Sequence, residues 1–201
     1  MNVSFLNRHQ GLKDALGIIT FVVLVIIGTL FINTFIFRSF TVEGRSMENT
    51  LHHGDRLIVN RVPVTASQIQ NKDYVPSRGQ VIIFKNPKFD EITGRDEYIV
   101  KRVIAFGGER VSLRDGHFTV YNAANPTGFN PDDENNNEPG KPTSGEDNDW
   151  DVPEGTIFVS GDHRQGSFSY DSRNGLGFIP LYDIIGPVGL RIFPFNKIRT
   201  F

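Results

Sequence analysis

Cysteine is absent from all 201 residues of the chain. This absence excludes disulfide frameworks, thiol nucleophiles and thiolate metal sites, so any nucleophile must be of another kind. The sequence also lacks a basic patch interleaved with aromatic residues, and it gives no reason to expect a nucleic-acid partner. The net charge is only −2, but residues 122–152 carry −7 and the remainder sums to about +5. A mildly basic body suits an anionic bilayer surface.

Groupings of metal-binding residue types are also scarce. The best one is His52-His53-x-Asp55. Strand or turn spacing would splay these three side chains, so we expect no metal site there. No other motif calls for a cofactor, and we expect none.

One long apolar run is present, from Ala15 to Phe37, and it contains no charged residue. Its 23 residues suffice to span a hydrocarbon core of about 30 Å at about 1.5 Å per residue. A cleavable signal peptide has a shorter core and a small-residue cleavage site, which this run lacks. We therefore predict a retained transmembrane helix over 15–37, after an N-terminal tail of residues 1–14. Basic residues flank both ends, so charge does not settle the orientation.

The remainder, residues 38–201, suffices for one domain and has mostly the pattern of β-strands. Asp115-Gly116 is a two-residue hairpin signal between two strand-like segments. A short helix is expected over Thr65–Gln70. The predicted strands are rich in β-branched and aromatic residues and bounded by turn residues; they are 56–62, 81–84, 98–106, 109–114, 117–121, 156–160 and 183–193.

Residues 122–152 differ in composition from the rest. They contain eight acidic residues, seven Asn and four Pro, with almost no large apolar side chain. Such a segment cannot bury enough surface to offset its ordering entropy. We expect an exposed acidic loop inserted in the β domain.

Two residues suggest chemistry. Ser46 follows the apolar run by only nine residues, which would place its hydroxyl near the bilayer surface. Lys101 shares one face of a predicted strand with Ile99 and Val103. Desolvation there would lower the lysine pKa and let the neutral amine accept a serine proton. The pattern alone fits equally a lysine whose stem lies on the sheet with its head in water.

Five blocks in the sequence together resemble bacterial type I signal peptidases. They occur in the family's order behind an N-terminal anchor, and the resemblance covers roughly residues 15–115 and 155–190. The blocks are Gly44-Arg-Ser46-Met47-Glu-Asn-Thr50-Leu51, Gly54-Asp55, Arg78-Gly79-Gln-Val-Ile-Ile-Phe84, Lys101-Arg102-Val103-Ile104, and Gly161-Asp162-His-Arg164 with Ser169-Tyr-Asp171-Ser172-Arg173.

The resemblance implies a role for each matched residue. Ser46 would be the nucleophile and Lys101 the general base. The oxyanion hole would use the backbone of Ser46 and Gly44, and Ser169 would orient the lysine. A supporting polar cluster would comprise Arg102, Asp162, Arg164, Asp171 and Arg173, and substrate contacts would come from Phe40, Thr41, Val42 and Ile99.

The sequence departs from the family pattern in three places. Asn49 stands where proline is usual, and Phe106-Gly-Gly-Glu109 replaces Leu-Pro-Gly-Asp. His163 stands for asparagine in a loop that is two residues longer before Asp171. This insertion leaves Ser167 as the alternative to Ser169.

The resemblance also implies the fold, the activity and the location. We expect a mainly antiparallel, barrel-like β domain that removes signal peptides from exported preproteins by cutting after small residues, as in Ala-x-Ala. The enzyme would lie in the plasma membrane with a cytoplasmic N-terminus and its catalytic domain outside. Two alternatives are a soluble repressor-type autoprotease, against which the apolar span argues, and a membrane-tethered β scaffold of the same family that has lost catalysis.

Overall fold

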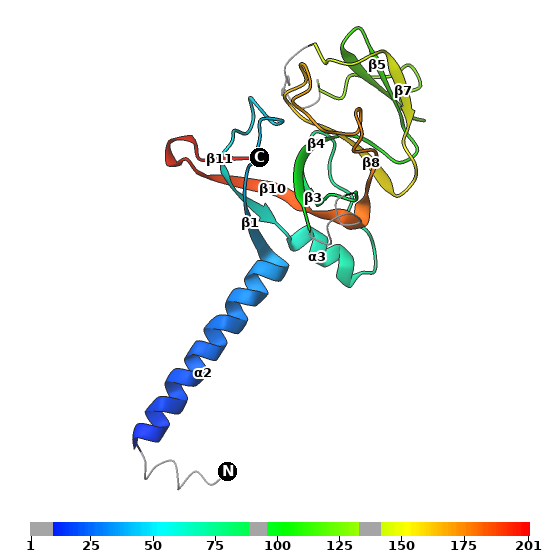
Figure 1. Cartoon of the computed structure of the whole chain (residues 1–201). Coiled ribbons are helices and arrows are strands. Elements are labelled where there is room, and N and C mark those ends of the chain that lie inside the picture. Colours follow the sequence, from blue (N-terminus) through cyan, green and yellow to red (C-terminus); the bar gives the residue numbers. More distant parts are fainter. Residues whose placement is uncertain (1–9, 89–95, 133–141) are drawn as a thin grey trace.

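An apolar helix projects from a β-rich body in the computed structural model (Figure 1). The structure describes residues 10–88, 96–132 and 142–201. The helix α2 spans Gln10–Phe31, and one turn of π-helix, η1, continues it over Ile32–Ile36. Within the described residues, Gly11–Ile36 is the one segment long and apolar enough to cross a membrane. The helix begins five residues before the predicted start, and Phe37 belongs to the following strand rather than to the span.

The body is built mainly of antiparallel strands, which confirms the predicted fold class. The larger sheet has the order β1-β2-β10-β3-β4-β8-β9, with β11 paired to β10. Its strands are β1 (Phe37–Thr41), β2 (Arg56–Asn60), β3 (Val81–Lys85), β4 (Tyr98–Phe106), β8 (Thr156–Ser160), β9 (Ile179–Pro180), β10 (Ile184–Phe193) and β11 (Arg199–Thr200).

A second, three-stranded sheet has the order β6-β5-β7 and lies at the end of the molecule remote from α2 (Figure 1). It comprises β5 (Arg110–Arg114), β6 (His117–Tyr121) and β7 (Asn148–Asp151). The predicted Asp115-Gly116 turn joins β5 to β6, with φ angles of 49° and 76°. Positive φ at both turn positions is what a two-residue hairpin needs, so this prediction is confirmed.

The predicted helix over 65–70 is misplaced by three residues at its start. Helix α3 spans Val62–Ile69, so the strand expected over 56–62 ends at Asn60. Pro63 explains the shift, because its fixed φ and missing N–H suit the first turn of a helix and not a paired strand. The predicted strand 183–193 likewise begins one residue later, after the 3-10 turn η3 (Leu181–Asp183). A second 3-10 turn, η4 (Phe195–Lys197), lies between β10 and β11.

The expectation of an exposed loop over 122–152 is wrong at both ends. Residues 148–151 form β7 and pair with β5, and Phe129 makes a β-bridge with Val120. The Trp150 ring lies 5.3 Å from that of Phe158, and Val152 is buried. The three large apolar residues Phe129, Trp150 and Val152 pack in the cluster around Phe118 and Phe158, which provides burial that the composition did not indicate. The middle of the predicted loop, 133–141, lies outside the described residues.

Three clusters of buried apolar side chains stabilise the body. One lies under β1, β2 and β3 and includes Val42, Met47 and Leu51. The second lies between β3, β4 and β8, and the third joins the two sheets around Phe118 and Phe158. Strand β4 runs beside the first two clusters, so Lys101 enters the core between well-packed neighbours.

Candidate active site

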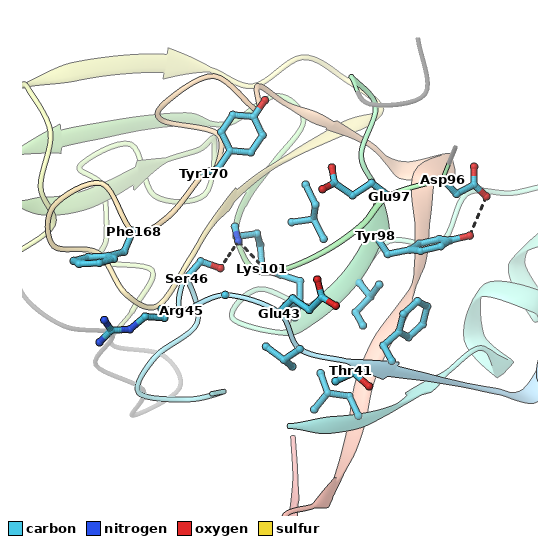
Figure 2. A pocket seen from close by; sticks show the side chains of 17 residues that line it. Thr41, Glu43, Arg45, Ser46, Asp96, Glu97, Tyr98, Lys101, Phe168 and Tyr170 are labelled. Carbon is cyan, nitrogen blue, oxygen red and sulfur yellow. Dashed lines mark hydrogen bonds between the residues drawn. The ribbon is translucent and has the colours of Figure 1, made fainter. Parts of the chain in front are cut away.

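Ser46 and Lys101 meet in the structure. Lys101 Nζ donates hydrogen bonds to Ser46 Oγ at 2.7 Å and to the Val100 carbonyl at 3.1 Å (Figure 2). Ser46 lies in the turn that follows β1, and Lys101 is the fourth residue of β4. The turn follows β1, which is not a neighbour of β4 in the sheet, so the pair depends on the tertiary fold.

Burial changes the charge of Lys101. The side chain is only 3% exposed, which rules out the interpretation that its head lies in water. Desolvation lowers the pKa of Lys101 from 10.5 to about 8, against the carboxylates of Asp171 and Asp162, which raise it. A neutral fraction of the amine therefore exists near neutral pH, as a base for a serine hydroxyl requires.

The turn that carries Ser46 is fixed on both sides. Met47 and Leu51 are fully buried, and the Leu51 N–H donates to the Met47 carbonyl at 2.8 Å. The His163 N–H donates to the Ser46 carbonyl at 3.0 Å. Although Asn49 replaces the family's proline, packing and these bonds hold the backbone of the serine in place.

Gly44 has a φ of +87°, a conformation that strongly favours glycine. Its N–H donates to His53 Nδ1 at 3.3 Å. This N–H therefore has a side-chain partner in the structure, and a substrate oxyanion would have to compete for it. The oxyanion-hole role of Gly44 stays a prediction.

Arg102 and Asp162 form the ion pair that the predicted polar cluster requires. Arg102 Nε and Nη2 donate to the two carboxylate oxygens of Asp162 at 2.7 and 2.6 Å, and both side chains are buried. Arg102 Nη1 also donates to the Gly79 carbonyl at 2.6 Å. Since Arg102 directly follows Lys101, this pair ties the lysine strand to the loop that begins at Gly161.

Asp171 organises the other half of the cluster. Arg173 donates to both of its oxygens at 2.9 and 2.8 Å, and the Gly161 N–H donates at 3.0 Å. Burial alone would raise the pKa of Asp171, but the bonds and charge of Arg173, helped by those of Ser169 and Gly161, lower it below the usual range. Asp171 is therefore an anion that helps to set the charge of Lys101.

The expected bond between Ser169 and Lys101 is not present. The Ser169 hydroxyl donates to Asp171 at 2.6 Å, because an ionised carboxylate is a stronger acceptor than an amine that is itself a donor. Ser169 is 1% exposed whereas Ser167 is exposed, so Ser169 is the serine that belongs to the buried cluster. Its influence on Lys101 passes through Asp171.

Arg164 departs from the predicted cluster. Its guanidinium makes a two-bonded pair with Asp132, both bonds at 2.8 Å, and its Nε donates to the Gly161 carbonyl at 2.9 Å. Sequence reasoning missed Asp132, because an aspartate in an acidic, Asn-rich segment gives no sign of being buried.

A cleft of about 530 Å³ opens beside the serine and lysine. The predicted substrate contacts Phe40, Thr41, Val42 and Ile99 all line it, together with Gly44. The sequence did not point to the other polar and aromatic side chains of its wall, which are Glu43, Arg45, Asp96, Glu97, Tyr98, Phe168 and Tyr170 (Figure 2).

Histidine and metal chemistry have no support in this site. The imidazole of His163 stacks on Phe168, with ring centroids 4.3 Å apart, and its Nδ1 lies 3.4 Å from Glu48. Asp55 bonds the His52 N–H and Arg191. Among the described residues, no group of three or more His, Asp and Glu side chains could hold a metal ion.

The arrangement combines a serine hydroxyl, a buried lysine of lowered pKa and an open cleft. It has the components of a hydrolase of the Ser/Lys kind, in which the amine takes the place that histidine occupies in other serine enzymes.

Comparisons with known proteins identify the family. A family model described as "Signal peptidase, peptidase S26" matches residues 15–193. Signal peptidase I of Bacillus licheniformis is 34% identical over 181 residues, covering 89% of this chain and 88% of its own. Signal peptidase I T of Bacillus subtilis (strain 168) is 34% identical over 182 residues, covering 89% and 85%. The chain belongs to the peptidase S26 signal peptidase family, and is a serine peptidase of that family.

Another relative differs in its stated activity. The protein named inactive signal peptidase IA, from Staphylococcus aureus (strain Mu50 / ATCC 700699), is 28% identical over 187 residues, covering 92% of this chain and 96% of its own. Family membership alone therefore does not establish that a given member is active, and the activity of this chain is argued from the side chains at its site.

Proposed function

We propose that this protein is a membrane-bound endopeptidase that removes signal peptides from exported preproteins by cutting after small residues. The observation that carries the proposal is the 2.7 Å bond between Ser46 Oγ and the buried Nζ of Lys101 in the wall of the cleft. Both reactive groups are present and within bonding distance, which favours an active enzyme over a scaffold that has lost catalysis.

The chemistry follows from this geometry. Ser46 Oγ attacks the scissile carbonyl carbon while Lys101 Nζ accepts the hydroxyl proton. The resulting oxyanion is stabilised by backbone N–H donors at Ser46 and Gly44. As the C–N bond breaks, the Lys101 ammonium returns the proton to the leaving amine, and an acyl ester remains on Ser46. Water then attacks the ester carbon while Lys101 accepts a water proton. As the bond to Ser46 Oγ breaks, Lys101 returns that proton to Ser46, and the signal peptide leaves with a free carboxylate.

Unpaired strand edges support peptide binding in the cleft. Strand β1 is an edge of the larger sheet, and β4 pairs with β8 only from Arg102 onward. The segments 40–44 and 98–101 therefore offer backbone groups to an extended peptide. Val42 and Ile99 line the cleft beside that path, and we propose that they form the shallow pockets for small substrate side chains.

The proposed topology places residues 1–14 in the cytoplasm, 15–37 across the bilayer and 38–201 outside. The apolar segment Gly11–Ile36 supports a single span, and the orientation follows the family resemblance. A reporter fused to either end of the full chain would test the orientation, because only one end should be accessible to an external protease.

The function is tested by incubating the full chain in detergent with a preprotein whose signal peptide ends in Ala-x-Ala. Wild type should release the mature protein, and Ser46→Ala and Lys101→Ala should not. Lys72→Ala, a change at an exposed lysine, is the matched control and should cleave normally. Replacing the alanine before the cleaved bond with leucine should stop cleavage by wild type. An inert wild type would favour the scaffold.

A further inference from the structure

Two residues of the acidic insertion, Asp132 and Ser144, form hydrogen bonds with the loop that supports the active site. This loop, residues 161–173, carries Asp162 and Asp171, and its His163 N–H bonds the Ser46 carbonyl at 3.0 Å. It lies directly against the nucleophile: a Cβ on Gly161 would stand 2.4 Å from the Ser46 carbonyl oxygen. A small shift of the loop would therefore move Ser46.

Arg164 of the loop forms the first connection, to Asp132 of the insertion. Its side chain is 1% exposed, and its Cζ lies 4.9 Å from the Phe118 ring centroid. It bonds Asp132 of the insertion through two nitrogens and the Gly161 carbonyl through the third. Asp132 is 6% exposed, so this pair is shielded from water and has well-defined geometry.

Ser144 of the insertion forms the second connection, through three hydrogen bonds. Its N–H donates to the Arg164 carbonyl, its Oγ accepts from the Gly166 N–H, and its carbonyl accepts from Arg173 Nη1, each at 2.8 Å. Arg173 is also the partner of Asp171. The insertion thus reaches Asp171 through Arg173, and it reaches Gly161, the neighbour of Asp162, through Arg164.

We propose that Asp132 is a positioning residue for the Ser46–Lys101 pair, acting through Arg164 and Gly161, and that the insertion is a working part of the active site. The proposal rests on the proposed peptidase function. Releasing Arg164 from Asp132 would loosen the loop, let water approach Lys101 and weaken the backbone contact to Ser46. The main loss would fall on the chemical step, because Gly161 and His163 of the loop lie against the Ser46 backbone. Phe168 and Tyr170 of the same loop line the cleft, so a smaller loss in peptide binding should accompany it.

The test compares Asp132→Asn with Asp149→Asn in the full chain. Both changes remove one carboxylate charge from the same insertion, but Asp149 is exposed and its partner is the exposed Arg114. Asp132→Asn should lower kcat roughly 10- to 100-fold, the scale that small misplacements of reacting groups produce, and raise KM by a smaller factor. Its acid limb in the pH profile should move to higher pH, because hydration of Lys101 raises that pKa. Asp149→Asn should match wild type.

Amide hydrogen exchange gives a readout that does not depend on activity. Residues 161–173 should exchange faster in Asp132→Asn than in wild type or Asp149→Asn. Unchanged kcat, pH profile and loop exchange in a folded Asp132→Asn protein would overturn the proposal, even if its melting temperature fell.

A second variant decides the question if Asp132→Asn does not fold. Ser144→Ala removes only the acceptor of the Gly166 N–H. It should slow kcat in the same direction by a smaller factor and speed exchange at Gly166, and wild-type values for both would overturn the proposal. If wild type itself cleaves no preprotein, the proposed function fails. The role of Asp132 is then tested only by amide hydrogen exchange of residues 161–173.

Discussion

At the scale of single residues, the charge of Lys101 controls the proposed reaction. Its pKa of about 8 results from burial, partly offset by Asp171 and Asp162. The amine is a base only when unprotonated, so activity should rise with pH up to this pKa and level off above it. A hydrated lysine would instead keep gaining activity toward its ordinary value of 10.5.

The first prediction is a pH profile of kcat/KM. We expect it to rise about tenfold per pH unit below pH 7 and to reach a plateau above about pH 8. Steady-state cleavage of a short peptide substrate between pH 5 and pH 10 would measure it. A flat acid side, or a rise that continues to pH 10, would contradict a buried lysine base.

The second prediction concerns how Ser46 and Lys101 act together. Ser46→Ala and Lys101→Met should each abolish cleavage, and the double variant should be scarcely worse than either single one, because each removes half of one unit. Additive partial losses would argue against the pair.

Lys101→Met should also leave the protein folded, and more stable at neutral pH. The folded state binds fewer protons than the unfolded state between about pH 8 and pH 10.5, so the wild type gains stability as pH rises through that window. Below it the buried ammonium is a constant cost that methionine removes. Urea unfolding at pH 7 would measure the difference, and Lys72→Met serves as the exposed control.

At this scale, the sequence identified the residues that lie in a recognisable local pattern or motif. Period-two alternation put Lys101 on the apolar face of its strand, and the family resemblance brought Ser46, Arg102 and Asp162 to it. The predicted partner of Ser169 was wrong and Asp132 was missed. In both cases the hydrogen bond depends on which acceptor the tertiary fold places near the donor. No local pattern encodes that choice.

At the scale of elements, the insertion is the part of the fold that composition described least well. The sequence predicted β4 and β8 with their observed bounds and the β5–β6 hairpin to within one residue, since each has strong alternation or turn residues. Strand β7 was missed because Asn148-Asp-Trp-Asp151 has only one apolar residue. In the structure this residue, Trp150, packs on Phe158 and so attaches the strand to the core.

The third prediction tests this packing through Trp150→Ala. The change removes the aromatic ring that packs on Phe158 and leaves β7 held by its backbone pairing with β5, so we expect a loss of about 2–4 kcal/mol of unfolding free energy. Chemical denaturation of the full chain in detergent would measure it. Asp149→Asn, on the exposed side of the same strand, should change stability by less than about 0.5 kcal/mol. Equal stability of Trp150→Ala and wild type would restore the exposed-loop interpretation of this end of the insertion.

At the scale of the whole molecule, the anchor and the β body are joined by specific bonds rather than by a loose linker. Arg61 Nε donates to the Thr34 carbonyl at 2.6 Å, and its N–H donates to the Ile36 carbonyl at 2.8 Å. The Thr65 hydroxyl donates to the Phe35 carbonyl at 2.9 Å. Helix α3 therefore caps the end of the apolar helix, and strand β1 leads from that point to the cleft. In the proposed topology, this short, paired path sets the distance of Ser46 from the bilayer.

The last prediction separates anchoring from chemistry. A protein that begins at Phe37 loses the apolar helix but keeps β1 paired with β2, and so retains the cleft. It should cleave a short soluble peptide nearly as fast as the full chain, yet process a preprotein held in vesicles roughly 100-fold more slowly or worse, because the shared membrane no longer concentrates enzyme and substrate. A protein that begins at Val42 is the control: it lacks β1, and should fail on both substrates. If the Phe37 protein processed vesicle-bound preprotein at the full-length rate, the anchor would have no part in presenting the substrate to Ser46.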